Sequence, residues 1–142
     1  MKGNLSSLPS RRSMLCLLAG GTLMTSALSA LADGRMAPEF TGLSGWINTA
    51  DPLNLAGLRG KVVLVNFWTY SCINCRRTIG YLNRWQAQYG AHGLQVIGIH
   101  TPEFGFERQM RNVADDVRKL GIRYPVGQDN DYATWRAWGN EA

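Results

Sequence analysis

The sequence predicts an α/β domain in which helices pack against a central sheet. Three apolar runs have the length of buried strands, and they lie at 62–68, 94–99 and 122–126. Two segments with helical spacing of apolar residues alternate with them, at about 74–89 and from about 107 to 120. Strands that are joined through a helix usually run parallel, so we expect a parallel core of three strands.

The first 32 residues are expected to be an export signal rather than part of the fold. Arg11 and Arg12 precede an uncharged span, 14–32, which ends in the small-residue sequence Ala30-Leu31-Ala32. The paired arginines resemble a twin-arginine signal, which would leave residues 33–142 as the mature domain. A retained membrane anchor is the alternative, because the span is nearly long enough to cross a bilayer.

Removing this signal changes the charge and the cysteine count. The full chain has 15 basic and 10 acidic residues, and the signal carries Lys2, Arg11 and Arg12. The mature domain therefore keeps 12 basic and 10 acidic residues, a formal charge near +2, with no basic cluster that would indicate nucleic-acid binding. Cys16 leaves as well, so both remaining cysteines belong to one Cys-x-x-Cys pair. That usage fits an active redox pair in an exported protein.

The segments around the predicted core have their own signals. Residues 33–60 contain several turn signals, and their apolar side chains can pack on the core through a short hairpin. Pro125 lacks the N–H that a central strand needs, so the third strand is expected near an edge. The turn Asp129-Asn130-Asp131 is expected to cap a short last helix that carries Tyr132, Trp135 and Trp138.

The cysteine pair lies where the first strand turns into the first helix, within Cys72-Ile73-Asn74-Cys75. Two sulfurs at this spacing can close a small disulfide ring. Cys72 lies beside free N–H groups at the helix start, which can stabilise its thiolate by at most about 2 kcal/mol and lower a thiol pKa from about 8.5 to roughly 7. Cys75, one turn further in, should be more enclosed. We therefore expect Cys72 to attack and Cys75 to resolve.

Other uses of the pair are less consistent with the sequence. Zinc needs four ligands, and only His92 and His100, at an irregular distance, could join the two thiols. An inert structural disulfide rarely lies at a strand-to-helix turn. Redox chemistry, which needs no cofactor, is the favoured interpretation.

The segment 61–68, followed by Cys72 and Cys75, resembles the thioredoxin superfamily, specifically the exported TlpA/ResA-like thiol–disulfide oxidoreductases. Segments 68–76, 100–104 and 129–135 are similar to the thioredoxin-like domain of DipZ-type proteins. The resemblance implies a thioredoxin-like fold, with helices on both faces of the sheet. It also implies periplasmic disulfide exchange with protein partners, as a reductant supplied by a membrane electron donor.

The same resemblance gives expectations for residues near the pair. Glu103 could correspond to an acidic residue that takes the proton from Cys75, although a solvated loop carboxylate is the alternative. Tyr70 could line the substrate groove or simply pack, and His100 is expected to be structural. Ser71 stands where many relatives have tryptophan.

The resemblance also implies a C-terminal portion that this chain does not contain. Related domains continue through a cis-proline, two antiparallel strands and a helix, whereas Pro102 and Pro125 lie at other positions. We therefore expect an incomplete domain with an open sheet edge and marginal stability. Two alternative functions follow: an inactive fragment, or a copper-binding protein that uses soft thiolates for Cu(I).

Overall fold

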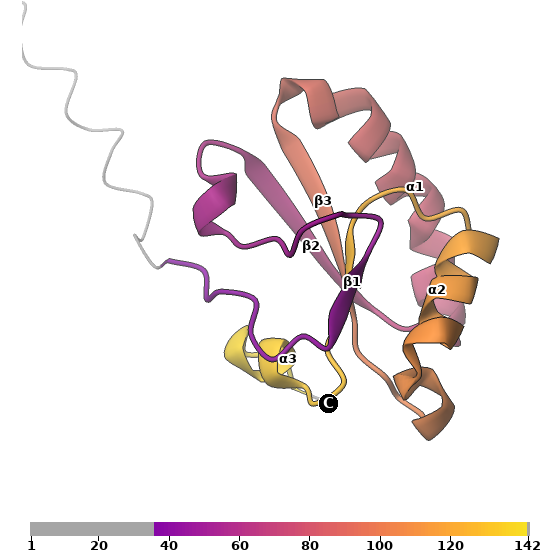
Figure 1. The fold of residues 1–142 in the computed structure, drawn as a ribbon. Helices are drawn as coiled ribbons and strands as arrows, with labels where there is room; N and C mark the ends of the chain where they lie inside the picture. The colour runs from indigo at the N-terminus through magenta and orange to yellow at the C-terminus, as the bar shows by residue number, and fades with distance from the viewer. Residues whose placement is uncertain (1–35, 142) are drawn as a thin grey trace, which may run out of the picture. The chain divides into compact units, whose positions relative to one another are not determined.

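The computed structural model describes residues 36–141, so the expected signal, residues 1–32, lies outside the described residues. Within that range a mixed sheet of four strands forms the middle layer (Figure 1). The strands are β1 (Gly45–Ile47), β2 (Val62–Trp68), β3 (Leu94–His100) and β4 (Val126–Gln128). Their order is β1-β4-β3-β2, in which β2, β3 and β4 run parallel and β1 runs antiparallel to β4.

Helical segments cover both faces of this sheet. α1 (Ile73–Tyr89) and α2 (Met110–Lys119) pack on one face, whereas α3 (Ala133–Ala137) and the segment before β2 cover the other (Figure 1). Alternation along β3 explains the two cores, because Val96 points toward α1 and α2 while Ile97 and Ile99 point to the opposite face. The three-layer α/β prediction is therefore confirmed. None of the helices within residues 36–141 is both long and apolar enough to cross a bilayer.

The predictions for the segments around the cysteines are confirmed closely. The first strand has the predicted bounds, and the second strand and first helix are each one residue longer than expected. The last helix, α3, has Tyr132 as its N-cap, without a side-chain cap, but the predicted turn before it does supply acceptors. Asp129 Oδ1 accepts the N–H of Ala133 and Oδ2 accepts the N–H of Trp135, each at 2.8 Å.

Three predictions are wrong. The third strand is β4 at 126–128 rather than 122–126, and it lies between β1 and β3 rather than near an edge. The segment 33–60 forms no hairpin in the described residues, because its strand β1 pairs with β4. The second helical segment is divided: a 3₁₀ turn (Gly105–Arg108) is separated from α2 by Gln109, whose backbone is extended.

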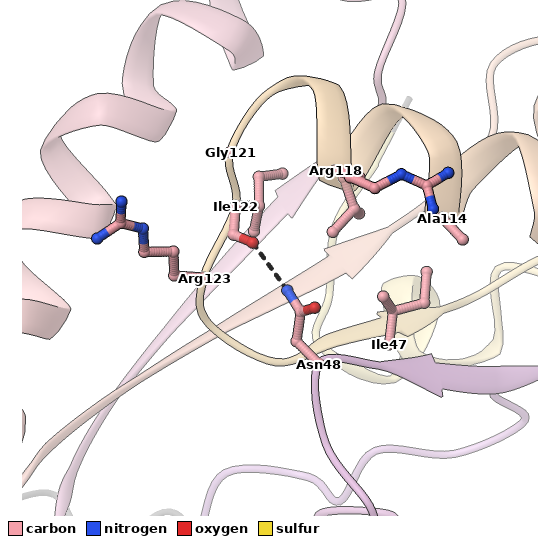
Figure 2. A pocket seen from close by; sticks show the side chains of 8 residues that line it. Ile47, Asn48, Ala114, Arg118, Gly121, Ile122 and Arg123 are labelled. Carbon is pink, nitrogen blue, oxygen red and sulfur yellow. Dashed lines mark hydrogen bonds between the residues drawn. The ribbon is translucent and has the colours of Figure 1, made fainter.

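Asn48 hydrogen-bonds the segment that precedes β4 (Figure 2). Its backbone is left-handed, with a φ of 62°, a conformation that asparagine tolerates better than most residues. From there its Nδ2 donates a hydrogen bond to the carbonyl oxygen of Ile122 at 2.9 Å, drawn in Figure 2, and another to that of Tyr124 at 3.2 Å. A side chain thus satisfies two carbonyls of the segment before β4. The carbonyl of Pro125 already accepts the N–H of Gly98 in β3, at 2.9 Å, and β4 begins at the next residue.

The sheet order leaves β2 as the outer strand on one side of the sheet formed by residues 36–141. Val62 at its start is 70 % exposed. The strand that leads to the cysteines therefore has a free backbone edge within the part of the chain described.

Candidate active site

Cys72 lies at the N-cap of α1, after the turn that follows β2. Its backbone is extended, with φ −71° and ψ 111°, and its carbonyl oxygen accepts the N–H of Arg76 at 3.0 Å. Its sulfur accepts the N–H of Cys75 at 3.4 Å, so the thiol takes the place of the oxygen that usually caps a helix. Both cysteines are free thiols and half-buried. The turn thus presents two sulfurs one helical turn apart.

The two thiols differ in acidity. The pKa of Cys72 is lowered, chiefly because the thiol of Cys75 and then its backbone N–H donate hydrogen bonds to the Cys72 sulfur. Burial raises the pKa of Cys75 to about 11, and its hydrogen bond to Cys72 raises it as well, whereas a backbone hydrogen bond from Thr69 lowers it. At neutral pH Cys72 is therefore the better nucleophile, and Cys75 holds its proton.

Glu103 lies in the loop after β3, and its side chain is exposed. Its negative charge raises the pKa of both Cys72 and Cys75, as the smallest of the effects on each thiol. The role of Glu103 as acceptor of the Cys75 proton stays a prediction.

The sequence reasoning missed Glu107, which is completely buried behind this turn. Its Oε1 accepts the hydroxyl of Thr69 at 2.5 Å and the N–H of Ser71 at 3.3 Å. Its Oε2 accepts the N–H groups of Glu103 at 2.7 Å and Phe104 at 2.9 Å. Burial raises the pKa of this carboxyl, but these hydrogen bonds outweigh it and lower the pKa to about 2.

A local pattern could have revealed Glu107. Phe104 precedes the 3₁₀ turn, and Glu107 stands three residues later, the spacing at which a carboxylate bonds back to the backbone N–H at a helix start. The expected helix began at about residue 107, so this turn was not recognised.

His100 ends β3 and is completely buried beside the same turn. Burial lowers its pKa to about 4, so the ring is neutral at pH 7. Its Nε2 lies 3.3 Å from the Thr69 hydroxyl oxygen, whose proton goes to Glu107, so Nε2 carries the ring hydrogen. The ring also stacks on Tyr70 with centroids 5.6 Å apart. These contacts fit the structural role expected for His100.

Exposed aromatic side chains adjoin the cysteine turn. Phe104 and Phe106 stack with centroids 5.5 Å apart, and Phe106 lies 6.2 Å from the ring of Tyr70. The Tyr70 hydroxyl donates to the carbonyl oxygen of Phe106 at 3.3 Å. Both phenylalanines are more than half exposed, at 52 % and 55 %. Tyr70 therefore belongs to an apolar surface next to Cys72, although its contact with a substrate stays a prediction.

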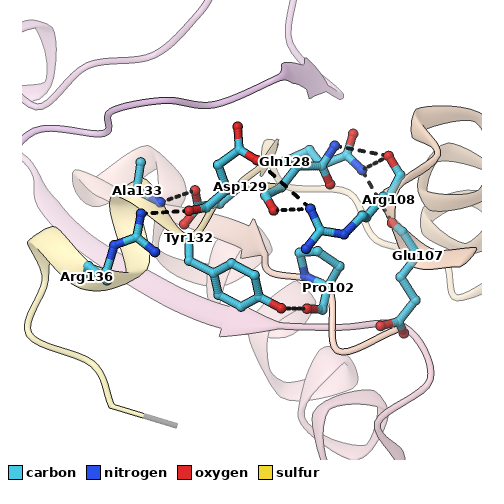
Figure 3. Close-up of polar contacts among 10 residues, drawn as sticks. Pro102, Glu107, Arg108, Gln128, Asp129, Tyr132, Ala133 and Arg136 are labelled. Atoms are coloured by element: carbon cyan, nitrogen blue, oxygen red, sulfur yellow. Dashed lines mark hydrogen bonds and ion pairs between the residues drawn. The ribbon is translucent and has the colours of Figure 1, made fainter. Parts of the chain in front are cut away.

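The loop after β3 is attached to the C-terminal segment by polar contacts (Figure 3). Gln128 Nε2 donates to the carbonyl oxygens of Arg108 at 3.0 Å and Glu107 at 3.4 Å. The hydroxyl of Tyr132 donates to the carbonyl oxygen of Pro102. The loop that carries Glu103 and Glu107 is thus fixed to the end of β4.

The described residues contain no group of side chains suited to bind a metal ion. Across residues 36–141, no three side chains of histidine, cysteine, aspartate or glutamate are grouped as a metal site requires. His100 is buried and bonded to Thr69. For the copper alternative, the two thiols therefore have no third ligand of these four residue types in this part of the chain.

Comparison with known proteins gives consistent matches. Residues 34–142 match the family model described as AhpC/TSA family. The chain is 51% identical over 106 residues to protein DipZ of Mycobacterium tuberculosis, covering 73% of this chain and 15% of DipZ. It is 28% identical over 124 residues to thiol-disulfide oxidoreductase ResA of Bacillus thuringiensis, covering 82% of this chain and 66% of ResA. It is also similar to the crystal structure of a thioredoxin-like superfamily protein, with a TM-score of 0.68, 27% identity, and coverage of 75% of this chain and 73% of that chain.

These matches confirm the resemblance to the thioredoxin superfamily and to DipZ and ResA. The chain spans 15% of the length of the DipZ protein, so what the two share is one domain. The fold, the family match over residues 34–142 and relatives named as thiol–disulfide oxidoreductases all agree. The chain belongs to the AhpC/TSA family, and its domain has the thioredoxin-like fold of that family of redox enzymes.

Proposed function

We propose that this chain is a thiol–disulfide oxidoreductase that reduces protein disulfides through Cys72 and Cys75. One observation carries the proposal: two free thiols lie one helical turn apart at the start of α1, where the Cys72 sulfur accepts the N–H of Cys75 at 3.4 Å. In this arrangement the pKa of Cys72 is lowered and that of Cys75 is raised to about 11. A low-pKa thiol at a helix start is a nucleophile, and its protonated neighbour is held in reserve. The names of relatives such as ResA support the same chemistry.

The reaction has two steps. The Cys72 thiolate attacks one sulfur of the partner disulfide, forms a mixed disulfide and expels the other partner sulfur as a thiolate, which takes a proton. Cys75 then loses its proton and attacks the Cys72 sulfur, which forms the Cys72–Cys75 disulfide and releases the second partner thiol. Two electrons pass from the pair to the partner, and an external dithiol donor must return them before the next cycle.

Glu103 is proposed as the group that receives the Cys75 proton. With a pKa of about 11, Cys75 is almost fully protonated at pH 7, so the second step needs a base. The Glu103 carboxylate is exposed, and its charge already acts on both sulfurs. It can take up the proton and then release it to water.

The direction and the partners are drawn from the resemblance to TlpA/ResA-like proteins. We propose protein disulfides as substrates and a membrane electron donor as the source of dithiol. The copper-binding alternative has no specific observation in its favour within residues 36–141. The inactive-fragment alternative is separated from the proposal by the activity assay itself.

Insulin reduction tests the proposal directly. The full chain, reduced and freed of excess reductant, should reduce about one insulin disulfide per molecule of protein. It should itself be oxidised in the process, and mass spectrometry should assign the new intramolecular disulfide to Cys72 and Cys75. A sample alkylated beforehand is the control. Insulin that stays oxidised while both thiols still react with iodoacetamide would rule out the function. Equilibration with glutathione buffers then gives the reduction potential and so the direction.

We also propose that the protein acts in the periplasm after export by the twin-arginine route. The sequence Arg11-Arg12 before an uncharged span supports this. Replacing both arginines with lysine should reduce periplasmic mature protein at least about tenfold, because the route depends on the arginine pair and not on charge alone. Cell fractionation measures it, and Lys2→Arg is the matched control. Undiminished periplasmic yield from the double variant would contradict the assignment.

A further inference from the structure

Glu107 is a buried carboxylate that the proposed exchange steps do not use. Its side chain is completely buried, and its four hydrogen bonds come from two different segments of chain. Oε1 holds Thr69 and Ser71, which directly precede Cys72. Oε2 holds the backbone of Glu103 and Phe104, in the loop after β3. Each oxygen of this carboxylate therefore bonds one of two segments: Oε1 the segment before Cys72, and Oε2 the loop after β3.

We propose that Glu107 is a positioning residue of the redox site, which locks the segment before Cys72 onto the loop that carries Glu103 and so sets the ease with which Cys75 resolves a mixed disulfide. The proposal rests on the function proposed above. It assigns a role to a residue that does not touch the substrate and acts through Thr69.

The contacts of these two segments support this role. The hydroxyl of Thr69 and the N–H of Ser71, both bonded to Glu107 Oε1, hold the chain just before Cys72. The backbone of Thr69 also lowers the pKa of Cys75 and so favours its thiolate. The charge of Glu103, in the loop after β3, disfavours both thiolates. The bridge from Glu107 thus fixes the two groups that act in opposite directions on Cys75.

The chemistry of the donors requires a carboxylate. Four donors need acceptor sites on both oxygens, which an ionised carboxylate has and an amide lacks on its nitrogen. Burying a charge is costly, and within residues 36–141 the ion pairs involve Arg108, Arg118 and their aspartates, not Glu107. A neutral side chain would link the two segments without the cost of burying a charge. The backbone of Glu107 is itself anchored, because its carbonyl accepts Gln128 Nε2 at 3.4 Å (Figure 3).

Thr69→Val gives the sharpest test, because valine keeps the shape but removes the hydroxyl donated to Oε1. In the full chain we expect Cys75 to resolve a mixed disulfide about tenfold more slowly, the effect of roughly one pKa unit. The pH profile of Cys75 alkylation, measured in Cys72→Ser backgrounds with and without Thr69→Val, should move to higher pH. Glu107→Gln should shift the profile in the same direction but by less, because it also loosens Glu103, whose charge has the opposite effect. Thr69→Ser, which keeps the hydroxyl, should restore the wild-type values.

Thr134→Val is the matched control. Thr134 is also completely buried, and its hydroxyl likewise links two segments, donating to the carbonyl oxygen of Thr41 at 2.7 Å. Its loss should lower stability without moving the thiol profile. An unchanged alkylation profile in folded Thr69→Val, or an equal shift in Thr134→Val, would overturn the proposal. Alkylation needs no disulfide partner, so this readout separates failure of the Glu107 role from failure of the proposed function.

Discussion

Cys72→Ser should abolish insulin reduction, lowering the rate at least about a thousandfold, because the only sulfur with a lowered pKa in the pair is then missing. Cys75→Ser should behave differently. Its Cys72 can still attack, but no second thiol resolves the product, so partner proteins should accumulate as mixed disulfides. The expected outcome is one inactive variant that traps nothing and one that traps its partners.

The measurement is a non-reducing gel with mass spectrometry of the trapped species, using insulin and then a periplasmic extract. Alkylation rates in the wild-type protein provide an independent check, and Cys72 should react faster than Cys75 at neutral pH. Equal trapping by the two variants, or faster alkylation of Cys75, would reverse the assigned roles. The Cys75→Ser variant keeps the backbone N–H that donates to the Cys72 sulfur, and its hydroxyl is a donor like the thiol it replaces, so attack by Cys72 and trapping should persist.

The sequence predicted those parts of the fold whose signal is local. β2 is a run of apolar residues, and the apolar face of α1 repeats with helical spacing, so the sequence alone locates both. The position of Cys72 at the helix start followed from these two elements. Its opposite shift from Cys75 followed in turn from enclosure within the first helical turn.

The missed features depend on contacts between residues far apart in the chain. The segment before β4 is held by Asn48, whose side chain bonds the carbonyl of Ile122, 74 residues further along the chain. No periodicity reports such a contact. Glu107 was missed for a similar reason, since its partners Thr69 and Ser71 precede it by 38 and 36 residues. Most glutamate side chains are exposed, so the sequence alone gives no reason to expect a buried one, and only the fold shows that Glu107 is buried.

The buried polar cluster behind the cysteines should make the domain unstable in acid. His100 has a folded pKa of about 4 against an ordinary value of 6.5, so the unfolded chain binds more protons between those values. The free energy of unfolding should therefore fall as the pH drops from about 6.5 to about 4. Glu107, with a folded pKa of about 2 against 4.5, is stabilising above pH 4.5, and that stabilisation should be lost as the pH drops toward 2.

Each shift corresponds to at most about 3 kcal/mol, so the two together approach the net stability of a typical domain, about 5–15 kcal/mol. Urea denaturation of the full chain from about pH 8 to about pH 3 measures the loss.

His100→Gln should flatten the curve of unfolding free energy against pH between about pH 6.5 and 4, because glutamine does not titrate. His92→Gln, at an exposed position, is the control and should keep the slope of the wild-type protein. A free energy of unfolding that stays constant down to pH 4, or an equal slope in His100→Gln and the wild-type protein, would show that His100 is not held neutral by the fold. Because the negative charge of Glu107 raises the pKa of His100, keeping that carboxylate should reduce the loss of stability that protonation of the histidine causes.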